Sequence, residues 1–163
     1  MFLLGWCHWL QNTWWATSLR ESDLLFPFVE GSHILALSLS VGMVLILDLR
    51  LLRVVFRGEP VSRIMRQVIP WAAPGFLLML STGFLLFAAH AEQVYQNRLF
   101  RWKFALLLVA GINALIYQLK LCPKMAEWDT APVVPAAARV AAVLSLTLWA
   151  CIIALGRTMA YEL

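Results

Sequence analysis

Two side chains able to bind a metal or carry a proton stand one helical turn apart in a long apolar segment. They are Glu30 and His33, in the stretch VEGSHILALSLSVG that covers residues 29–42. Residues three apart are neighbours on one face of a helix, so the carboxylate and the imidazole are expected side by side. A neutral imidazole is a common metal ligand, and a neighbouring carboxylate can orient its ring. The alternative role for His33 is a hydrogen bond between helices, and the alternative for Glu30 is solvent exposure.

The composition places this pair in a membrane protein. Of the 163 residues, 62% are hydrophobic and 13% are charged, whereas a soluble domain usually carries about a quarter charged residues. A helix that crosses the hydrocarbon layer needs about 20 mainly apolar residues. The stretches that satisfy this length cover residues 26–52, 69–91, 100–119 and 136–155. We therefore expect an all-α integral membrane protein whose residues 21–163 form an antiparallel four-helix bundle.

Residues 1–20 differ from these spans and carry an apolar face rich in tryptophan. The residues that recur on this face at helical spacing are Phe2, Trp6, Trp9, Leu10, Thr13, Trp14 and Thr17. Indole rings prefer the headgroup level of a bilayer, so the spacing predicts an amphipathic helix on the membrane surface. The segment lacks the charged region and cleavage site of a signal peptide and is expected to be retained.

Lysine and arginine residues set the expected orientation, because cytoplasmic loops of membrane proteins are enriched in them. The connections after the first and third spans carry Arg50, Arg53, Arg57, Arg63, Arg66, Lys120, Lys124 and Arg139. The opposite side carries fewer, namely Arg20, Arg98, Arg101, Lys103 and Arg157. We therefore expect both termini to face away from the cytoplasm, which for the inner membrane of a bacterium is the periplasm. The net charge of +4 then reflects cytoplasmic loops, and no nucleic-acid partner is expected.

Three of the predicted helices bring ionisable groups to a similar depth near the periplasmic face. Glu30 and His33 lie on the first helix, His90 ends the second, and Lys103 begins the third. Such groups are costly in a membrane span and often mark a functional site. As alternatives, His90 belongs to the water interface, and Lys103 extends its long chain to the headgroups. The convergence of these groups predicts a polar or cofactor-bearing site.

Two chemistries suit a histidine in such a bundle. One is b-type haem, with His33 as an axial ligand and His90 or Lys103 completing or supporting the site. The other is a copper site with His33 and His90 as metal ligands, or with a methionine. A di-iron site needs a second Glu-x-x-His motif, which the sequence lacks. The cysteines Cys7, Cys122 and Cys151 lie far apart and predict neither a disulfide framework nor a zinc site.

A second polar cluster surrounds the first cytoplasmic connection. Asp48 and Arg50 stand at the end of the first span, and Arg63 and Arg66 follow the connection. Charge-assisted hydrogen bonds of Asp48 with Arg63 or Arg66 would pin the connection. The predicted role of this cluster is structural.

Three stretches resemble a family of uncharacterised four-helix bacterial membrane proteins, over residues 18–118. They are SLRESDLLFPFVEGSHILALSLSVGMVLILDLRLL, PVSRIMRQVIPWAAPGFLLMLSTGFLLF and NRLFRWKFALLLVAGINALIYQ, with signposts at His33, Leu52, Thr82–Phe87, Asn97, Phe100 and Lys103. More distantly, the layout is similar to the copper-resistance D-type membrane domain and to the HemJ type of protoporphyrinogen oxidase. The latter resemblance implies b-haem associated with His33 and Lys103. Gln118 stands where the resemblance to the HemJ type implies a further histidine, so the identity of the second axial ligand stays open.

Three functions follow from these observations. The first is a redox protein that binds b-type haem near the periplasmic face and transfers electrons. The second is copper or small-solute handling along a path lined by Glu30 and His33, and the third is a structural subunit of a larger membrane complex. The expected partners are the lipid bilayer and either other membrane subunits or a periplasmic redox protein. No Ser-His-Asp set, phosphate loop or nucleotide fingerprint is present, so hydrolysis and nucleotide-driven roles are not expected, and whether the chain is an enzyme stays open.

Overall fold

The chain is all-helical in the part that the computed structural model describes, which comprises residues 2–129, 131, 133–159 and 161. No strand occurs in these residues, which confirms the all-α prediction. Four helices are long and apolar enough to cross a membrane. The α-helices are α1 (Phe2–Gln11), α2 (Trp14–Glu21), α3 (Leu25–Leu51), α4 (Val61–Ala89), α5 (Ala91–Gln96), α6 (Arg98–Ile116), α7 (Met125–Trp128) and α8 (Ala136–Met159).

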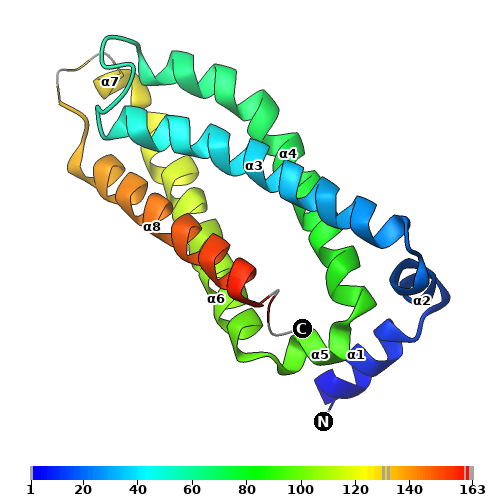
Figure 1. Ribbon diagram of the computed structural model, residues 1–163. Coiled ribbons are helices and arrows are strands. Elements are labelled where there is room, and N and C mark those ends of the chain that lie inside the picture. The colour runs from blue at the N-terminus through cyan, green and yellow to red at the C-terminus, as the bar shows by residue number, and fades with distance from the viewer. Residues whose placement is uncertain (1, 130, 132, 160, 162–163) are drawn as a thin grey trace.

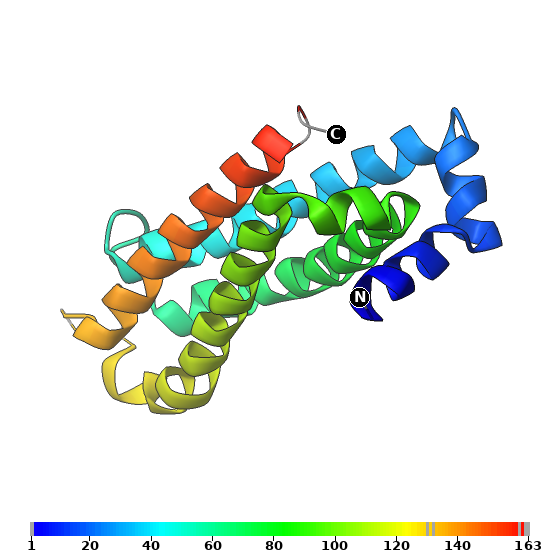
Figure 2. The same cartoon turned by 90° about the horizontal axis from the view of Figure 1, so that it is seen from below.

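The four long helices form an antiparallel bundle built from two pairs. Helix α3 packs along α4, helix α6 packs along α8, and a shorter contact between α3 and α8 joins the pairs. An aromatic contact links α4 to α6 near α5, where Phe87 stacks on Phe100 with ring centroids 5.3 Å apart. The connections α3–α4 and α6–α8 lie at one end of the bundle, here called the α7 end. Helices α1, α2 and α5 and the last turn of α8 lie at the other, the α5 end (Figures 1 and 2).

Helix α4 begins at Val61, earlier than the predicted start of the second span at residue 69. Pro60 precedes it as the N-cap residue, with a φ of −59°, and proline is well tolerated at a helix start because it has no N–H to satisfy. The prediction followed the apolar residues alone and therefore left the first turns of α4, which carry Arg63, outside the span. Pro70 and Pro74 lie inside α4 without ending it, as membrane helices tolerate when their neighbours satisfy the freed backbone groups.

The third span extends beyond its predicted end at residue 119. Helix α6 passes into a π-helix at Tyr117–Leu121, then into a 3-10 helix at Cys122–Lys124, and then into α7. Pro123 lacks a backbone N–H and cannot join the α-helical hydrogen-bond ladder, which explains the change of helix type. The whole helical run, Arg98–Trp128, still qualifies as a membrane span.

The N-terminal segment forms two short helices, whereas the tryptophan spacing predicts one. The Asn12 side chain donates to the His8 carbonyl at 2.9 Å, and the Thr13 hydroxyl donates to the Leu10 carbonyl at 2.7 Å. These polar groups close α1, and the chain turns before α2. Leu10 is buried in a cluster with residues of α4 and α5, while Trp14 is 81% exposed. The exposed indole suits the predicted position at a membrane surface.

At the α7 end, polar contacts pin the α3–α4 connection, but through partners other than those predicted. Arg50 donates from its guanidinium to the Glu59 carbonyl, with an Nε–O distance of 2.8 Å. Arg63 pairs instead with the Glu59 carboxylate at 2.8 Å. The predicted pairing of Asp48 with the arginines of the connection is therefore wrong. Asp48 is 5% exposed, and it faces α8, where the Ser145 side chain forms a hydrogen bond with it.

Asp129 joins the α6–α8 connection to the start of α4. Its carboxylate accepts hydrogen bonds from the Ser62 backbone N–H at 2.8 Å and from the Ser62 hydroxyl at 2.6 Å. Burial raises the pKa of this carboxyl, but the hydrogen bonds from Ser62 and from the Val61 backbone, together with the positive charge of Arg50, hold the pKa below its ordinary value. Asp129 thus links the two connections at this end through hydrogen bonds to a charged carboxylate.

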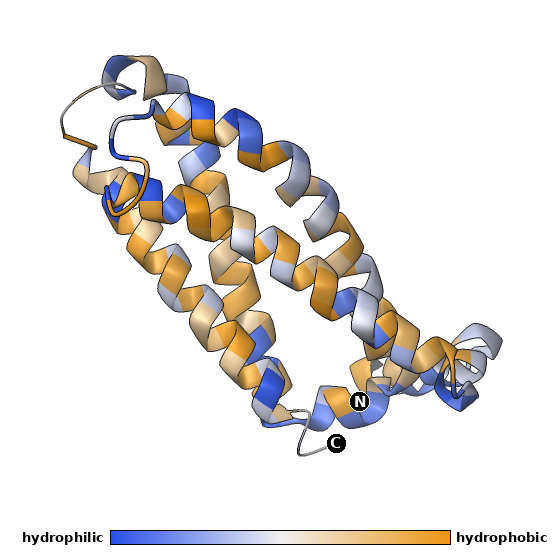
Figure 3. Cartoon of the chain, turned by 45° about the horizontal axis from the view of Figure 1, so that its top comes forward, coloured by the Kyte–Doolittle hydropathy of each residue, from blue (hydrophilic) through white to orange (hydrophobic). Residues whose placement is uncertain are grey.

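The outer surface of the bundle is apolar. Figure 3 shows hydrophobic residues along all four long helices, with polar residues mostly near the two ends. In the most apolar part of α3, α4 and α8, between 28% and 33% of the residues are buried, whereas in the α6 span the share is 6%. The remaining surface is suited to lipid or to another membrane-embedded protein. Helix α6 offers the largest uncovered share.

Close packing of α3 against α4 depends on Gly75. A Cβ atom built at Gly75 would lie 3.1 Å from the Cβ of Ser40, which is fully buried on α3. Small residues at such crossings let two membrane helices approach closely, where lipid removes the hydrophobic drive for association. By contrast, a Cβ built at Gly42 would meet nothing within 4 Å.

We expect Gly75→Leu to destabilise the bundle by about 1–3 kcal/mol, because the added side chain must separate α3 from α4. Gly42→Leu is the matched control and should leave stability close to that of the unmodified protein. Thermal unfolding of both variants in mild detergent measures the difference. Equal midpoints for the two variants would contradict the crossing described above.

Candidate functional site

His33 is held by the neighbouring helix α4. The Ser22 side chain accepts a hydrogen bond from the Leu25 N–H at 3.1 Å and so helps to start α3, which places His33 about two turns inside that helix. Nδ1 of His33 lies 3.0 Å from the carbonyl oxygen of Met79 and 3.0 Å from the hydroxyl oxygen of Thr82. This contact ties α3 to α4 in the half of the bundle near α5.

These two partners determine which ring nitrogen of His33 carries the proton. A carbonyl oxygen can only accept, and the Thr82 hydroxyl donates its own proton to the Leu78 carbonyl at 2.7 Å. Nδ1 is therefore the donor, and Nε2 holds a free lone pair. Within the described residues, Nε2 has no hydrogen-bond partner. A free imidazole lone pair with a fixed tautomer is the arrangement that a metal ligand requires.

Gly83 gives the imidazole its space. A Cβ atom built at Gly83 would lie 3.0 Å from Cε1 of His33, so a side chain at this position would displace the ring. Met79, Thr82 and Gly83 are spaced three and four residues apart and share one face of α4. Thr82 and Gly83 were not predicted to belong to the site, and their helical spacing was the signal that could have linked them to a partner residue.

Lys103 lies on α6 and points against α8. Asn97 caps α6 by accepting a hydrogen bond from the Leu99 N–H at 2.7 Å, and Lys103 follows in the second turn. A Cβ atom built at Gly156 of α8 would lie 3.0 Å from Nζ of Lys103. The side chain is half-buried, and no ion pair includes it in the part of the chain that the structure describes.

Three of the four predicted site residues share one neighbourhood. The Lys103 ammonium and the Glu30 carboxylate both act electrostatically on the His33 imidazole. Glu30 is exposed and stands one helical turn from His33 on α3. The groups therefore converge from α3 and α6 on the same region, with α4 holding the imidazole. This region therefore contains one free imidazole lone pair, one ammonium group and one exposed carboxylate.

The structure does not bring His90 together with His33. His90 stands between α4 and α5, and its ring contacts Phe26 edge-on with centroids 5.4 Å apart. It comes seven residues after Gly83, which corresponds to about 10 Å along a helix. Burial, together with the positive charge of Arg20, lowers the pKa of His90 below its ordinary value. Arg20 in turn donates to the Ala89 carbonyl at 3.2 Å, so His90 belongs to the packing of α2 on α4.

The described residues contain no group of three or more His, Cys, Asp or Glu side chains that could hold a metal ion. The arrangement at His33 thus offers one imidazole ligand from the protein. It suits a group that brings most of its own ligands better than it suits a bare metal ion, which needs several protein ligands.

The fold and this site define a multi-pass helical membrane protein with an imidazole held between α3 and α4. A family model described as a family of unknown function, DUF6644, matches residues 22–162. The chain belongs to that family, which extends the sequence resemblance through the fourth long helix. No curated protein matches the chain, and no solved structure matches it.

The lowered pKa of His90 predicts a pH-dependent stability. The unfolded chain, with an imidazole pKa near 6.5, binds a proton more readily than the folded state does. The free energy of unfolding therefore does not change through His90 above that pH, and it declines as the solution is acidified below it. We expect His90→Gln to lose less thermal stability than the unmodified protein between about pH 8 and about pH 5.5. Unfolding midpoints across this range measure the difference. Parallel pH profiles for the two proteins would contradict the assignment.

Proposed function

We propose that this membrane protein binds b-type haem through His33 and takes part in electron transfer. The observation that carries the proposal is the hydrogen bonding of His33, whose Nδ1 donates to Met79 and Thr82 and leaves the Nε2 lone pair free. Haem-ligating histidines commonly donate their second ring N–H to a backbone carbonyl, which fixes the ring and raises its basicity. A haem macrocycle supplies four of its own nitrogen ligands, so one or two protein ligands suffice.

The other groups at the site have roles that suit the same cofactor. Lys103, half-buried and in no described ion pair, offers a cationic hydrogen-bond donor for a propionate or stands beside the second axial position. Gly83 leaves the space in which the imidazole is held. Apolar surroundings in the membrane exclude water from the ligand. Bound haem would supply one-electron chemistry.

The orientation that we propose places the α5 end, and with it His33, at the periplasmic face of a bacterial inner membrane. The connections α3–α4 and α6–α8 carry the larger share of lysine and arginine and would be cytoplasmic. Both chain ends would then be periplasmic. A periplasmic redox protein or a partner membrane subunit would exchange electrons at that face.

A structural role in a larger membrane complex is the second candidate, favoured by the surface of α6. The share of buried residues in its span is 6%, against at least 28% for the other three spans. A partner helix packed there would cover this face. Copper handling gains less support, because no group of three His, Cys, Asp or Glu side chains is gathered in the described parts of the chain.

The direct test replaces the proposed ligand. Purified in mild detergent, the unmodified protein should show a b-type reduced-minus-oxidised spectrum, and His33→Ala should lose it because the iron loses its imidazole ligand. His90→Ala is the matched control, since His90 packs against Phe26 away from Nε2 of His33, and it should keep the spectrum. A b-type spectrum that survives His33→Ala would contradict the assignment.

A second variant perturbs the ligand without removing it. In Gly83→Ala the new methyl group must displace the His33 ring, so we expect a lower haem content and a shifted Soret maximum. Gly111→Ala is the control, because a Cβ there meets nothing within 4 Å. Absorption spectra and haem content per chain distinguish the two variants. Identical spectra for both would show that the imidazole of His33 does not touch the chromophore.

A further inference from the structure

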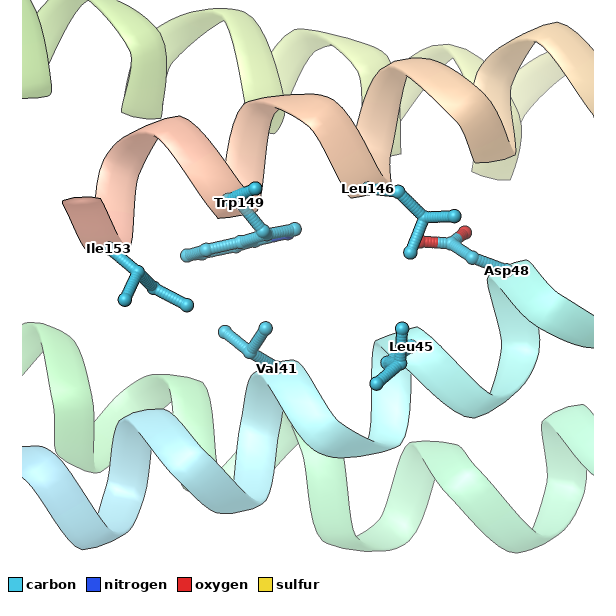
Figure 4. A pocket seen from close by; sticks show the side chains of 7 residues that line it. Val41, Leu45, Asp48, Leu146, Trp149 and Ile153 are labelled. Carbon is cyan, nitrogen blue, oxygen red and sulfur yellow. The ribbon is translucent and has the colours of Figure 1, made fainter.

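A pocket of about 190 Å³ lies between α3 and α8 near the middle of the bundle, and His33 does not line it. Its walls are almost entirely apolar, with Val41 and Leu45 on α3 and Leu146, Trp149 and Ile153 on α8 (Figure 4). Leu45 and Ile153 are 42% and 44% exposed, so the pocket reaches the surface of the bundle. In a bilayer that surface is covered by lipid, and a ligand would enter from the membrane.

One carboxylate closes the pocket at its end nearest the α3–α4 connection. Asp48 lines the pocket and reaches from α3 toward α8 beside Leu146 (Figure 4). The residue is 5% exposed, and its Oδ2 has no hydrogen-bond partner within the described residues. The Ser145 side chain provides the hydrogen bond that the carboxyl does make. A buried, unsatisfied carboxylate oxygen is costly, and such groups in membrane proteins face partners or substrate paths.

The charged groups around Asp48 do not supply its missing partner. Arg50 directs its guanidinium to the Glu59 carbonyl, and neither of the ion pairs found in the described residues includes Asp48. The Tyr117 hydroxyl lies within electrostatic range of Asp48 but makes no hydrogen bond there. Within the described residues, Oδ2 of Asp48 therefore remains an acceptor without a partner in the wall of the pocket.

We propose that this pocket binds a small lipophilic ammonium ion, with its charged nitrogen on Asp48 and its apolar body along Trp149. A cation satisfies the unpaired carboxylate oxygen through a charge-assisted hydrogen bond. The indole ring of Trp149, which lies lengthwise between the two helices (Figure 4), adds a flat apolar wall for the ring of the ligand. The polar group sits at one end only, which matches an amphiphile that has one charged head.

The volume of the pocket limits the size of this ligand. An apolar cavity of about 150 Å³ holds benzene, so a pocket of about 190 Å³ admits one aromatic ring with a short side arm. Larger organic cations with several rings would not fit between α3 and α8 without separating the helices. The proposed ligand class is therefore an arylalkylamine of roughly this size. This site is independent of the haem proposed at His33.

The test uses 2-phenylethylamine as the probe and the full-length protein in nanodiscs of zwitterionic phosphatidylcholine. Ligand-observed saturation-transfer NMR measures binding, with protein-free nanodiscs as the reference. We expect saturable binding by the protein and a loss of affinity of about tenfold or more in Asp48→Asn, the size expected for a hydrogen bond to a charged group. The neutral isostere 2-phenylethanol should bind more weakly by a similar factor.

Two further variants keep the result independent of folding defects. Ala150→Leu narrows the same pocket without changing Asp48 and should also abolish binding. Glu127→Gln removes an exposed carboxylate at the α7 end and should leave binding unchanged. Equal affinity for the amine and the alcohol, unchanged binding in Asp48→Asn and Ala150→Leu, or equal signals from protein-free nanodiscs would each overturn the proposal.

Discussion

In a bilayer, each buried polar group of a protein must find its hydrogen-bond partner within the protein, because lipid tails offer none. At the α5 end this requirement is met where Nδ1 of His33 donates across to Met79 and Thr82 on α4. At the α7 end, beyond the apolar spans, Asp129 accepts hydrogen bonds from Ser62 and joins the two connections. These contacts tie neighbouring parts of a bundle whose surfaces are otherwise apolar. They also show which polar atoms are left without a partner.

Two of the polar atoms that lack a partner within the described residues carry the functions that we propose for the bundle. Nε2 of His33 carries a free lone pair, and the hydrogen bonds of the same ring fix the direction of that lone pair. Oδ2 of Asp48 is an unpaired acceptor in the wall of an apolar pocket. The lone pair of His33 suits a metal-centred cofactor, and the acceptor of Asp48 suits a cation. The two residues lie near opposite ends of α3. Helix α3 therefore carries both proposed sites, while α4 and α8 each provide the opposing wall of one.

The sequence was sufficient to predict the all-helical bundle, because apolar stretches of about 20 residues have few other solutions. It also grouped Glu30, His33, His90 and Lys103 from their positions along the helices, although His90 packs against Phe26 and not beside His33. It could not show that His33 turns to Met79 and Thr82, since which faces of α3 and α4 meet depends on the close approach of Gly75 to Ser40. The pairing of Asp48 failed for a related reason: a charge count does not show that a side chain faces α8. The break between α1 and α2 depended on side-chain hydrogen bonds of Asn12 and Thr13 that hydrophobic periodicity ignores.

The central claim is that the imidazole held between α3 and α4 binds haem. The most direct measurement is the haem and iron content per chain of the unmodified protein, purified from a host with an adequate haem supply. The account predicts about one haem per chain, with a b-type spectrum that responds to reduction. A colourless protein free of iron would contradict it, and His33 would then serve only to join two helices.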